Sequence, residues 1–266
     1  MPLTLPDVDR RPLAKSPLAV TVFQVRFEQN LSVGDGATGL RMHQQLGGRE
    51  GLYPRIESQQ SVTAQMQISP LGISPITASG VPARGLRMRD DAGTWVLTVM
   101  PDFVSLETTG YTTWTDDFRE RLTAILNAIN EHVSPRVEER VGLRYINRVI
   151  EPDVTLPSDF QGLISPSLLG AVADPLWSQA ITSSQQQLEM DIADDIKCLL
   201  RHGTLPRSTG FGLEAYLLDF DLFRQQPREF KVEDIVQTAD ELNNTATALF
   251  QGALTSDYLA RLREGD

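Results

Sequence analysis

The chain of 266 residues is 41% hydrophobic and 22% charged, which is the balance of a globular protein rather than a membrane-embedded or disordered one. Its net charge of -11 opposes contact with phosphate backbones and anionic lipids, so we expect neither non-specific nucleic-acid binding nor membrane association. The acidic excess lies in the second half: residues 1–135 carry 12 basic and 14 acidic side chains, and residues 136–266 carry 12 and 21. Such a surface suits a basic protein partner, although solubility alone also explains it.

The sequence lacks signals for membrane insertion, secretion and disulfide bonds. No run of about 18 apolar residues predicts a transmembrane helix, and the first residues lack the basic and apolar regions of a secretory signal. The single cysteine, Cys198, excludes an intrachain disulfide and a cysteine-cluster metal site, and its apolar neighbours favour a small buried thiol. We therefore expect a cytoplasmic protein.

The first half predicts an arm followed by a β-rich lobe. Residues 1–17 hold four prolines and no periodicity, so we expect an extended N-terminal arm. Residues 18–27 alternate in the manner of a strand. A short helix is expected at 37–46, a loop at 69–82, and further strands at 62–68, 85–89, 94–100 and 103–108. The strands at 85–89 and 94–100 are expected to form a hairpin around the turn at 90–93.

A long amphipathic helix begins near Trp114, with Thr113 as its cap. Its apolar side chains recur at spacings of three and four, which predicts packing against a sheet rather than a cofactor site. Ser134 and Pro135 end the helix.

The second half repeats this order in outline. Residues 140–149 alternate as a strand, and a loop with a short helical stretch follows at 158–172. Strands are then expected at 188–192, 196–201 and 212–223, and a second long helix from Val232.

The predicted fold class is α+β, with two similar lobes at residues 18–135 and 136–266, each a mostly antiparallel sheet covered by a long amphipathic helix. The second lobe carries the acidic excess. The strand at 140–149 opens that lobe, and the alternative that it pairs with the first lobe and fuses both into one body remains open.

The strand at 140–149 also holds the candidate ligand-binding residues. Arg144 and Arg148 share one face, and guanidinium groups on one strand face suit a carboxylate or a phosphate. Pairing with acidic residues of the second lobe is the structural alternative. Asn147 lies on the opposite, apolar face, where a buried amide needs partners and either ties the strand to a helix or lines a pocket.

The best metal candidate is Asp219 with Asp221, which place two carboxylates on one face of a strand. Asp191, Asp194 and Asp195 join them if their strands pair, although a solvated sheet face produces the same alternation. Walker A, dinucleotide-binding and nucleophile-elbow motifs are absent, as are histidine pairs at metal-binding spacing. No catalytic residue and no cofactor are therefore expected.

The segment from Gly142 to Asn147, Gly-Leu-Arg-Tyr-Ile-Asn, resembles the signature of a sporadically distributed family of bacterial proteins. The resemblance extends to Pro17–Phe27 and to Val104–Leu106 with Tyr111–Trp114 and Phe118, and so covers nearly the whole chain. It implies a bacterial, cytoplasmic protein, and it brings no catalytic residues with it. The sporadic distribution implies a mobile module such as a toxin–antitoxin or phage-defence system.

We therefore predict a non-catalytic protein-binding module, antitoxin-like or associated with phage defence. The first alternative is an enzyme or sensor that binds a phosphorylated or nucleotide ligand through Arg144 and Arg148, with a metal at Asp219 and Asp221. The second alternative is a homo-oligomer in which an exposed sheet edge or the acidic lobe packs on itself.

Overall fold

The computed structural model describes residues 3–5, 7–61, 64–69, 72–77, 83–152, 154–193, 195–207 and 212–265. Its α-helices are α1 (Ala37–Gln45), α2 (Arg119–His132), α3 (Pro166–Leu169), α4 (Val232–Ala253) and α5 (Ser256–Glu264). Short helical turns are η1 (Leu31–Asp35), η2 (Gly48–Glu50), η3 (Trp114–Phe118), η4 (Pro157–Phe160) and η5 (Gly170–Ala173). Among the described residues, no helix combines the length and the apolar character needed to cross a membrane.

Ten strands form one sheet, so the expectation of two lobes with a sheet each is wrong. The order is β2-β5-β6-β7-β1-β8-β11-β10-β9, with β12 paired to β8. These strands are β1 (Leu18–Phe27), β2 (Arg55–Ser61), β5 (Ala83–Arg89), β6 (Trp95–Met100), β7 (Phe103–Thr108), β8 (Val137–Val149), β9 (Gln185–Asp191), β10 (Ile196–Pro206), β11 (Leu213–Arg224) and β12 (Arg228–Glu229).

The pairing of β1 with β8 explains why two sheets become one. At one end of the pair the Arg148 N–H donates to the Pro17 carbonyl (2.8 Å), and at the other the Glu28 N–H donates to the Val137 carbonyl (3.3 Å). The two strands therefore run antiparallel. Because β8 has strand neighbours on both sides, its main-chain groups are satisfied along both edges, and the strand that was expected to open a second lobe is an interior strand.

The predicted repetition of element order is visible in the strand order. Outward from the β1–β8 pair, one side runs β7, β6, β5 and the other runs β11, β10, β9. In each case the last strand of an antiparallel meander pairs with the strand that opened that half. Short local turns make the meanders, and a long helix, α2 or α4, follows each one.

The chain divides into two compact units. Unit 1 comprises Met1–Thr21, Gly142–Gln225 and Gln237–Asp266, and unit 2 comprises Val22–Val141 and Gln226–Val236.

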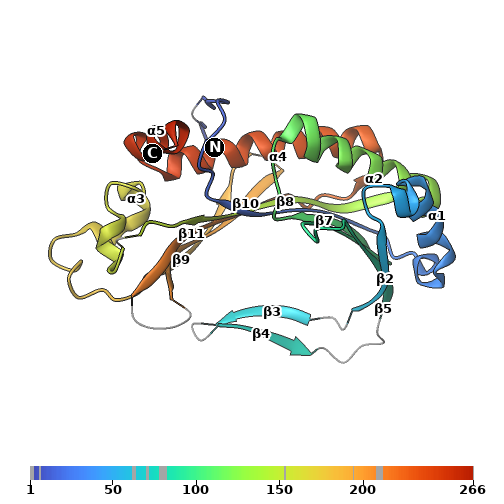
Figure 1. The fold of residues 1–266 in the computed structure, drawn as a ribbon, viewed down its shortest axis with the longest axis horizontal. Coiled ribbons are helices and arrows are strands. Elements are labelled where there is room, and N and C mark those ends of the chain that lie inside the picture. The colour runs from blue at the N-terminus through green and yellow to red at the C-terminus, as the bar shows by residue number, and fades with distance from the viewer. Residues whose placement is uncertain are drawn as a thin grey trace. The chain divides into compact units, whose positions relative to one another are not determined.

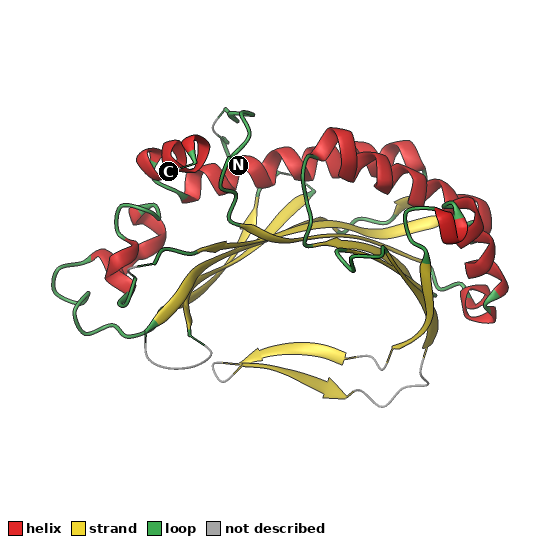
Figure 2. Ribbon diagram, viewed as in Figure 1, coloured by secondary structure: helices red, strands yellow, loops and turns green. Residues whose placement is uncertain are grey.

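In unit 1, helices α4 and α5 cover one face of strands β8, β11 and β10 (Figures 1 and 2). The apolar stripe of α4 is buried on the sheet and includes Ala239, Leu242 and Ala246. Two polar contacts fix the register of helix on sheet. The Tyr145 hydroxyl donates to Asn243 Oδ1 (2.7 Å), and Arg224 donates to the Thr238 hydroxyl.

In unit 2, the predicted hairpin and the predicted helix are both present. Strands β5, β6 and β7 form an antiparallel meander, in which the Asp90 carboxylate closes the first turn by accepting the Trp95 N–H (3.0 Å). The helix starts as the π-helical turn η3 and continues as α2, and the Thr113 hydroxyl caps it by accepting the Asp116 N–H (3.3 Å). Arg121 lies 4.3 Å over the Trp95 ring, which fastens α2 to the sheet.

The expected loop at 69–82 is wrong at its centre. A strand, β4 (Gly72–Thr77), pairs antiparallel with β3 (Ala64–Ser69) as a separate two-stranded sheet. The prolines and glycines of this stretch suggested a loop, but an isolated hairpin tolerates them because it has free edges. Residues 70–71 and 78–82 of the expected loop, and residues 62–63 of the expected strand before it, lie outside the described residues.

Candidate functional site

The arginines of β8 lie on the sheet face opposite α4 in unit 1, because side chains alternate along a strand and Tyr145 faces α4. Arg144 makes a bidentate pair with Asp219 of β11, with Nε to Oδ1 and Nη2 to Oδ2 both at 2.7 Å. Arg201 of β10, directly opposite Asp219 in the ladder, approaches the same carboxylate at 3.4 Å. The carboxylate of a buried aspartate thus lies between two guanidinium groups.

The other two predicted ligand residues also have internal partners. Arg148 forms a charge-assisted hydrogen bond to Glu214 of β11. Asn147 is buried on the α4 side of the sheet, where its Nδ2 donates to the Leu218 carbonyl (3.2 Å). Asn147 therefore ties β8 to a neighbouring strand, β11, whereas the expected tie was to a helix.

This arrangement joins a residue expected to bind an anion with one expected to bind a cation. The hydrogen bonds that Arg144 donates to Asp219 raise the pKa of Arg144 above its ordinary value, and Asp221 adds to this through its charge. Both carboxylate oxygens of Asp219 accept from arginine, so few lone pairs remain for a metal ion. Within the described part of the chain, no three His, Cys, Asp or Glu side chains cluster as a metal site would require.

Of the other residues of the metal hypothesis, Asp191 has a basic partner in the structure. Asp191 of β9 pairs with Lys197 of β10 at 3.2 Å. Asp194 lies outside the described residues.

The reactive side chains of unit 1 are buried and structural. Cys198 is buried in β10, and desolvation raises the pKa of its thiol to about 12, so the thiol is protonated at neutral pH. His202 is also buried, with Nδ1 2.9 Å from the Tyr216 hydroxyl, and desolvation lowers its pKa. A neutral imidazole fits this apolar position.

An exposed apolar loop in unit 1 was not predicted from the sequence. The Leu-Trp loop (residues 174–181) carries Leu176 and Trp177, whose exposed fractions are 75% and 56%. Its main chain is held by hydrogen bonds from the Ser178 N–H to the Asp174 carbonyl (2.9 Å) and from the Leu176 N–H to Asp174 Oδ1 (2.8 Å). Two large apolar side chains are therefore presented to solvent on an ordered turn.

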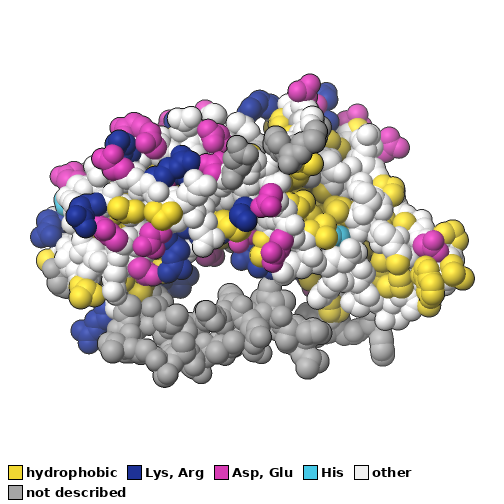
Figure 3. All heavy atoms as spheres, turned by 180° about the vertical axis from the view of Figure 1, so that it is seen from behind, with side chains coloured by type: hydrophobic (Ala, Val, Ile, Leu, Met, Phe, Trp, Pro, Cys, Tyr) yellow, Lys and Arg dark blue, Asp and Glu magenta, His cyan; other side chains and the backbone are white. Residues whose placement is uncertain are grey.

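All the charged residues of the segment around this loop are acidic. Between Ile150 and Ile196 the sequence contains eight Asp or Glu residues and no Lys, Arg or His. Further exposed apolar residues of this segment are Ile150, Leu156 and Leu188. Figure 3 shows hydrophobic side chains gathered on the part of unit 1 that carries α3. The long interval without a basic residue was the sequence signal that could have located this surface.

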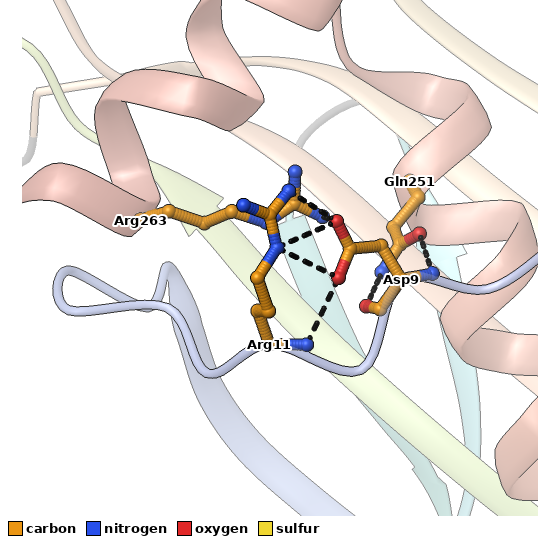
Figure 4. Close-up of polar contacts among 4 residues, drawn as sticks. All are labelled: Asp9, Arg11, Gln251 and Arg263. Atoms are coloured by element: carbon orange, nitrogen blue, oxygen red, sulfur yellow. Dashed lines mark hydrogen bonds and ion pairs between the residues drawn. The ribbon is translucent and has the colours of Figure 1, made fainter.

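The N-terminal arm is fastened to α4 and α5 of unit 1. The Asp9 N–H donates to Gln251 Oε1 (3.1 Å), and Gln251 Nε2 donates to the Asp9 carbonyl (2.7 Å), so one side chain satisfies both main-chain groups (Figure 4). The Asp9 carboxylate also accepts from Arg11 (2.6 Å) and lies 3.1 Å from Arg263. Arg11 thereby holds the pKa of Asp9 well below its usual range.

No protein-family model matches this chain, and no curated protein sequence matches it.

Proposed function

We propose that the protein is a non-catalytic interaction module that binds a basic partner polypeptide through the Leu-Trp loop of unit 1. The observation that carries the proposal is the exposure of Leu176 and Trp177 on an ordered turn. Tryptophan anchors dominate the energy of many protein interfaces because they bury a large area with few rotatable bonds. A loop that is already ordered binds with a smaller entropic cost than a flexible one.

The charge around the loop specifies the chemistry of the partner. The sequence between Ile150 and Ile196 holds eight acidic and no basic residues, and an acidic excess of this kind repels acidic proteins and attracts basic ones. We therefore expect the partner to present an apolar pocket for Trp177 with Lys or Arg side chains around it.

The arginines of β8 support this proposal over the ligand-binding alternative. Arg144 uses both Nε and Nη2 on Asp219, and Arg148 donates to Glu214, so binding of a phosphate would first have to break these pairs.

The resemblance to the sporadic bacterial family extends the proposal to a biological setting. There the partner would belong to a toxin–antitoxin or phage-defence system.

Affinity purification of the full chain from its host, with quantitative mass spectrometry of co-purifying proteins, tests the proposal. We expect a stoichiometric basic partner whose recovery falls as salt rises, because the attraction between exposed charges is screened within roughly 10 Å at 0.1 M salt. The variant Leu176→Ser/Trp177→Ser should lose this partner, because removal of an interface anchor costs about 2 kcal/mol or more, roughly a 30-fold loss of affinity.

The matched control is Leu31→Ser, because Leu31 is exposed to nearly the same extent (74%) but belongs to unit 2. It should retain the partner. Equal recovery with both variants, or purification of the protein without any stoichiometric partner, contradicts the proposal.

A further inference from the structure

Strand β9 ends the sheet in unit 1 with an open edge. Among the described residues β10 is the only strand that pairs with it. Nearly all of its seven residues, Gln185–Asp191, are exposed. Edge strands in natural proteins are commonly protected by lysine, proline or a bulge, and this strand contains neither lysine nor proline.

The hydrogen bonds at both ends of the β9–β10 ladder identify the main-chain groups that face the open edge. The Thr204 N–H donates to the Ser184 carbonyl (2.7 Å), and the Ile192 N–H donates to the Ile196 carbonyl (2.9 Å). Within β9 the even-numbered residues therefore direct their main-chain groups at β10, whereas the carbonyl of Ile192, beyond the strand, accepts the Leu3 N–H (3.0 Å). The N–H and C=O groups of the odd-numbered residues point away from it, and these residues are Gln185, Gln187, Glu189 and Asp191.

We propose that β9 pairs antiparallel with β9 of a second copy of this chain, about a two-fold axis at Leu188. In this register each Gln187 faces Glu189 of the other copy, and each Gln185 faces Asp191. These odd-numbered pairs exchange both main-chain hydrogen bonds, and each carboxylate lies opposite an amide that can donate to it. The two Leu188 side chains form the close, non-hydrogen-bonded pair at the axis.

The neighbouring registers fit less well. A two-fold axis at Glu189 would place two carboxylates directly opposite each other, which is unfavourable. An axis at Gln187 would leave Asp191 beyond the last residue of the facing strand. The axis at Leu188 alone pairs all seven residues and sets no like charges face to face. Leu188 itself is 39% exposed, so pairing removes an apolar side chain from water.

Two side chains of β9 already have partners within unit 1. Lys197 of β10 lies 3.2 Å from Asp191 and offsets its charge. On the other face Gln186 donates to the Leu168 carbonyl (3.4 Å), which connects β9 to α3. The strand is thus ordered before it pairs, as an isologous interface requires.

Charge variants at Leu188 test the axis directly. Sedimentation equilibrium of the full wild-type chain should give twice the 29.5 kDa mass of one chain. Leu188→Lys and Leu188→Glu each place like charges at the axis and should raise the dissociation constant at least tenfold. An equimolar mixture of the two variants should restore the dimer as a heterodimer, because opposite charges then meet at the axis.

Gln187→Pro provides a second, independent variant. It removes an N–H that points away from β10, so the β9–β10 ladder is preserved while the open edge is blocked. Leu40→Lys, at an exposed position of α1 in unit 2, is the control that should leave the dimer intact. Circular dichroism confirms that each variant is folded.

A monomeric wild type at every concentration tested overturns the proposal. So does a dimer that Leu188→Lys leaves unchanged, or failure of the mixed variants to associate. Self-association joins two acidic chains and should strengthen as salt rises, whereas binding of a basic partner should weaken. The two proposals therefore fail or succeed separately.

Discussion

Replacement of Arg144 by methionine should destabilise the protein, because it leaves the Asp219 carboxylate in an environment only 2% exposed to water. Breaking a fully buried ion pair costs roughly 3–5 kcal/mol. Arg144 is 36% exposed and Arg201 still approaches Asp219 at 3.4 Å, so solvent and the second guanidinium reduce the penalty. We expect a loss of about 2–3 kcal/mol, which corresponds to a fall in melting temperature of roughly 5–10 °C for a chain of this size.

The assay is urea denaturation of a double-mutant cycle. Asp219→Leu combined with Arg144→Met removes both charges of this pair and leaves only the Arg201 guanidinium without its carboxylate. This double variant should be more stable than Arg144→Met alone, because no buried carboxylate is then left without its main partner. Arg148→Met is the matched control. Its partner Glu214 is 42% exposed, so its loss should be below about 1 kcal/mol.

Equal losses for Arg144→Met and Arg148→Met would refute this reasoning. A double variant as unstable as the sum of its two single variants would do the same. In either case the Arg144–Asp219 pair would not contribute to stability as a buried ion pair, and the ligand-binding alternative for β8 would regain support.

Three further predictions concern other parts of the chain. Cys198 should react with a thiol reagent at pH 8 only after unfolding, because burial raises its pKa to about 12 and the thiol stays protonated. Thr113→Ala should cost about 1 kcal/mol in urea denaturation through loss of the α2 cap, whereas Thr113→Ser should be nearly neutral. Burial lowers the pKa of His202 in the folded protein, so on acidification the unfolded chain takes up this proton before the folded chain does, and stability falls as the pH drops below about 6.5. His202→Gln should therefore lose less stability than the wild type between pH 8 and pH 5. An equal loss in the two proteins would contradict this.

Local patterns in the sequence predicted most of the secondary structure. The alternating residues of β1, β8 and β11 and the apolar stripes of α2 and α4 arise because each element buries one face. The spacing of apolar residues in the sequence therefore indicates the type of each element. Thr113 was recognisable as a cap because its hydroxyl acts on a residue three positions away. The hairpin between β5 and β6 was likewise marked by its turn residues.

Long-range pairing could not be predicted in the same way. The β1–β8 ladder is made by main-chain groups, which carry no side-chain signal, so one sheet and two sheets were equally compatible with the pattern. The pair between Arg144 and Asp219 joins residues 75 positions apart. The sequence identified both as polar residues on strand faces but not that they face each other. The exposure of Leu176 and Trp177 could not be predicted either, because large apolar side chains are usually buried.

The central claim, that the Leu-Trp loop contacts a partner, is tested most directly by photo-crosslinking in the host cell. A benzophenone amino acid at position 177 should give one dominant cross-linked product that contains a basic protein, and the same probe at position 31 of unit 2 should not. Absence of a cross-link at position 177, or the same product from both positions, would contradict the account.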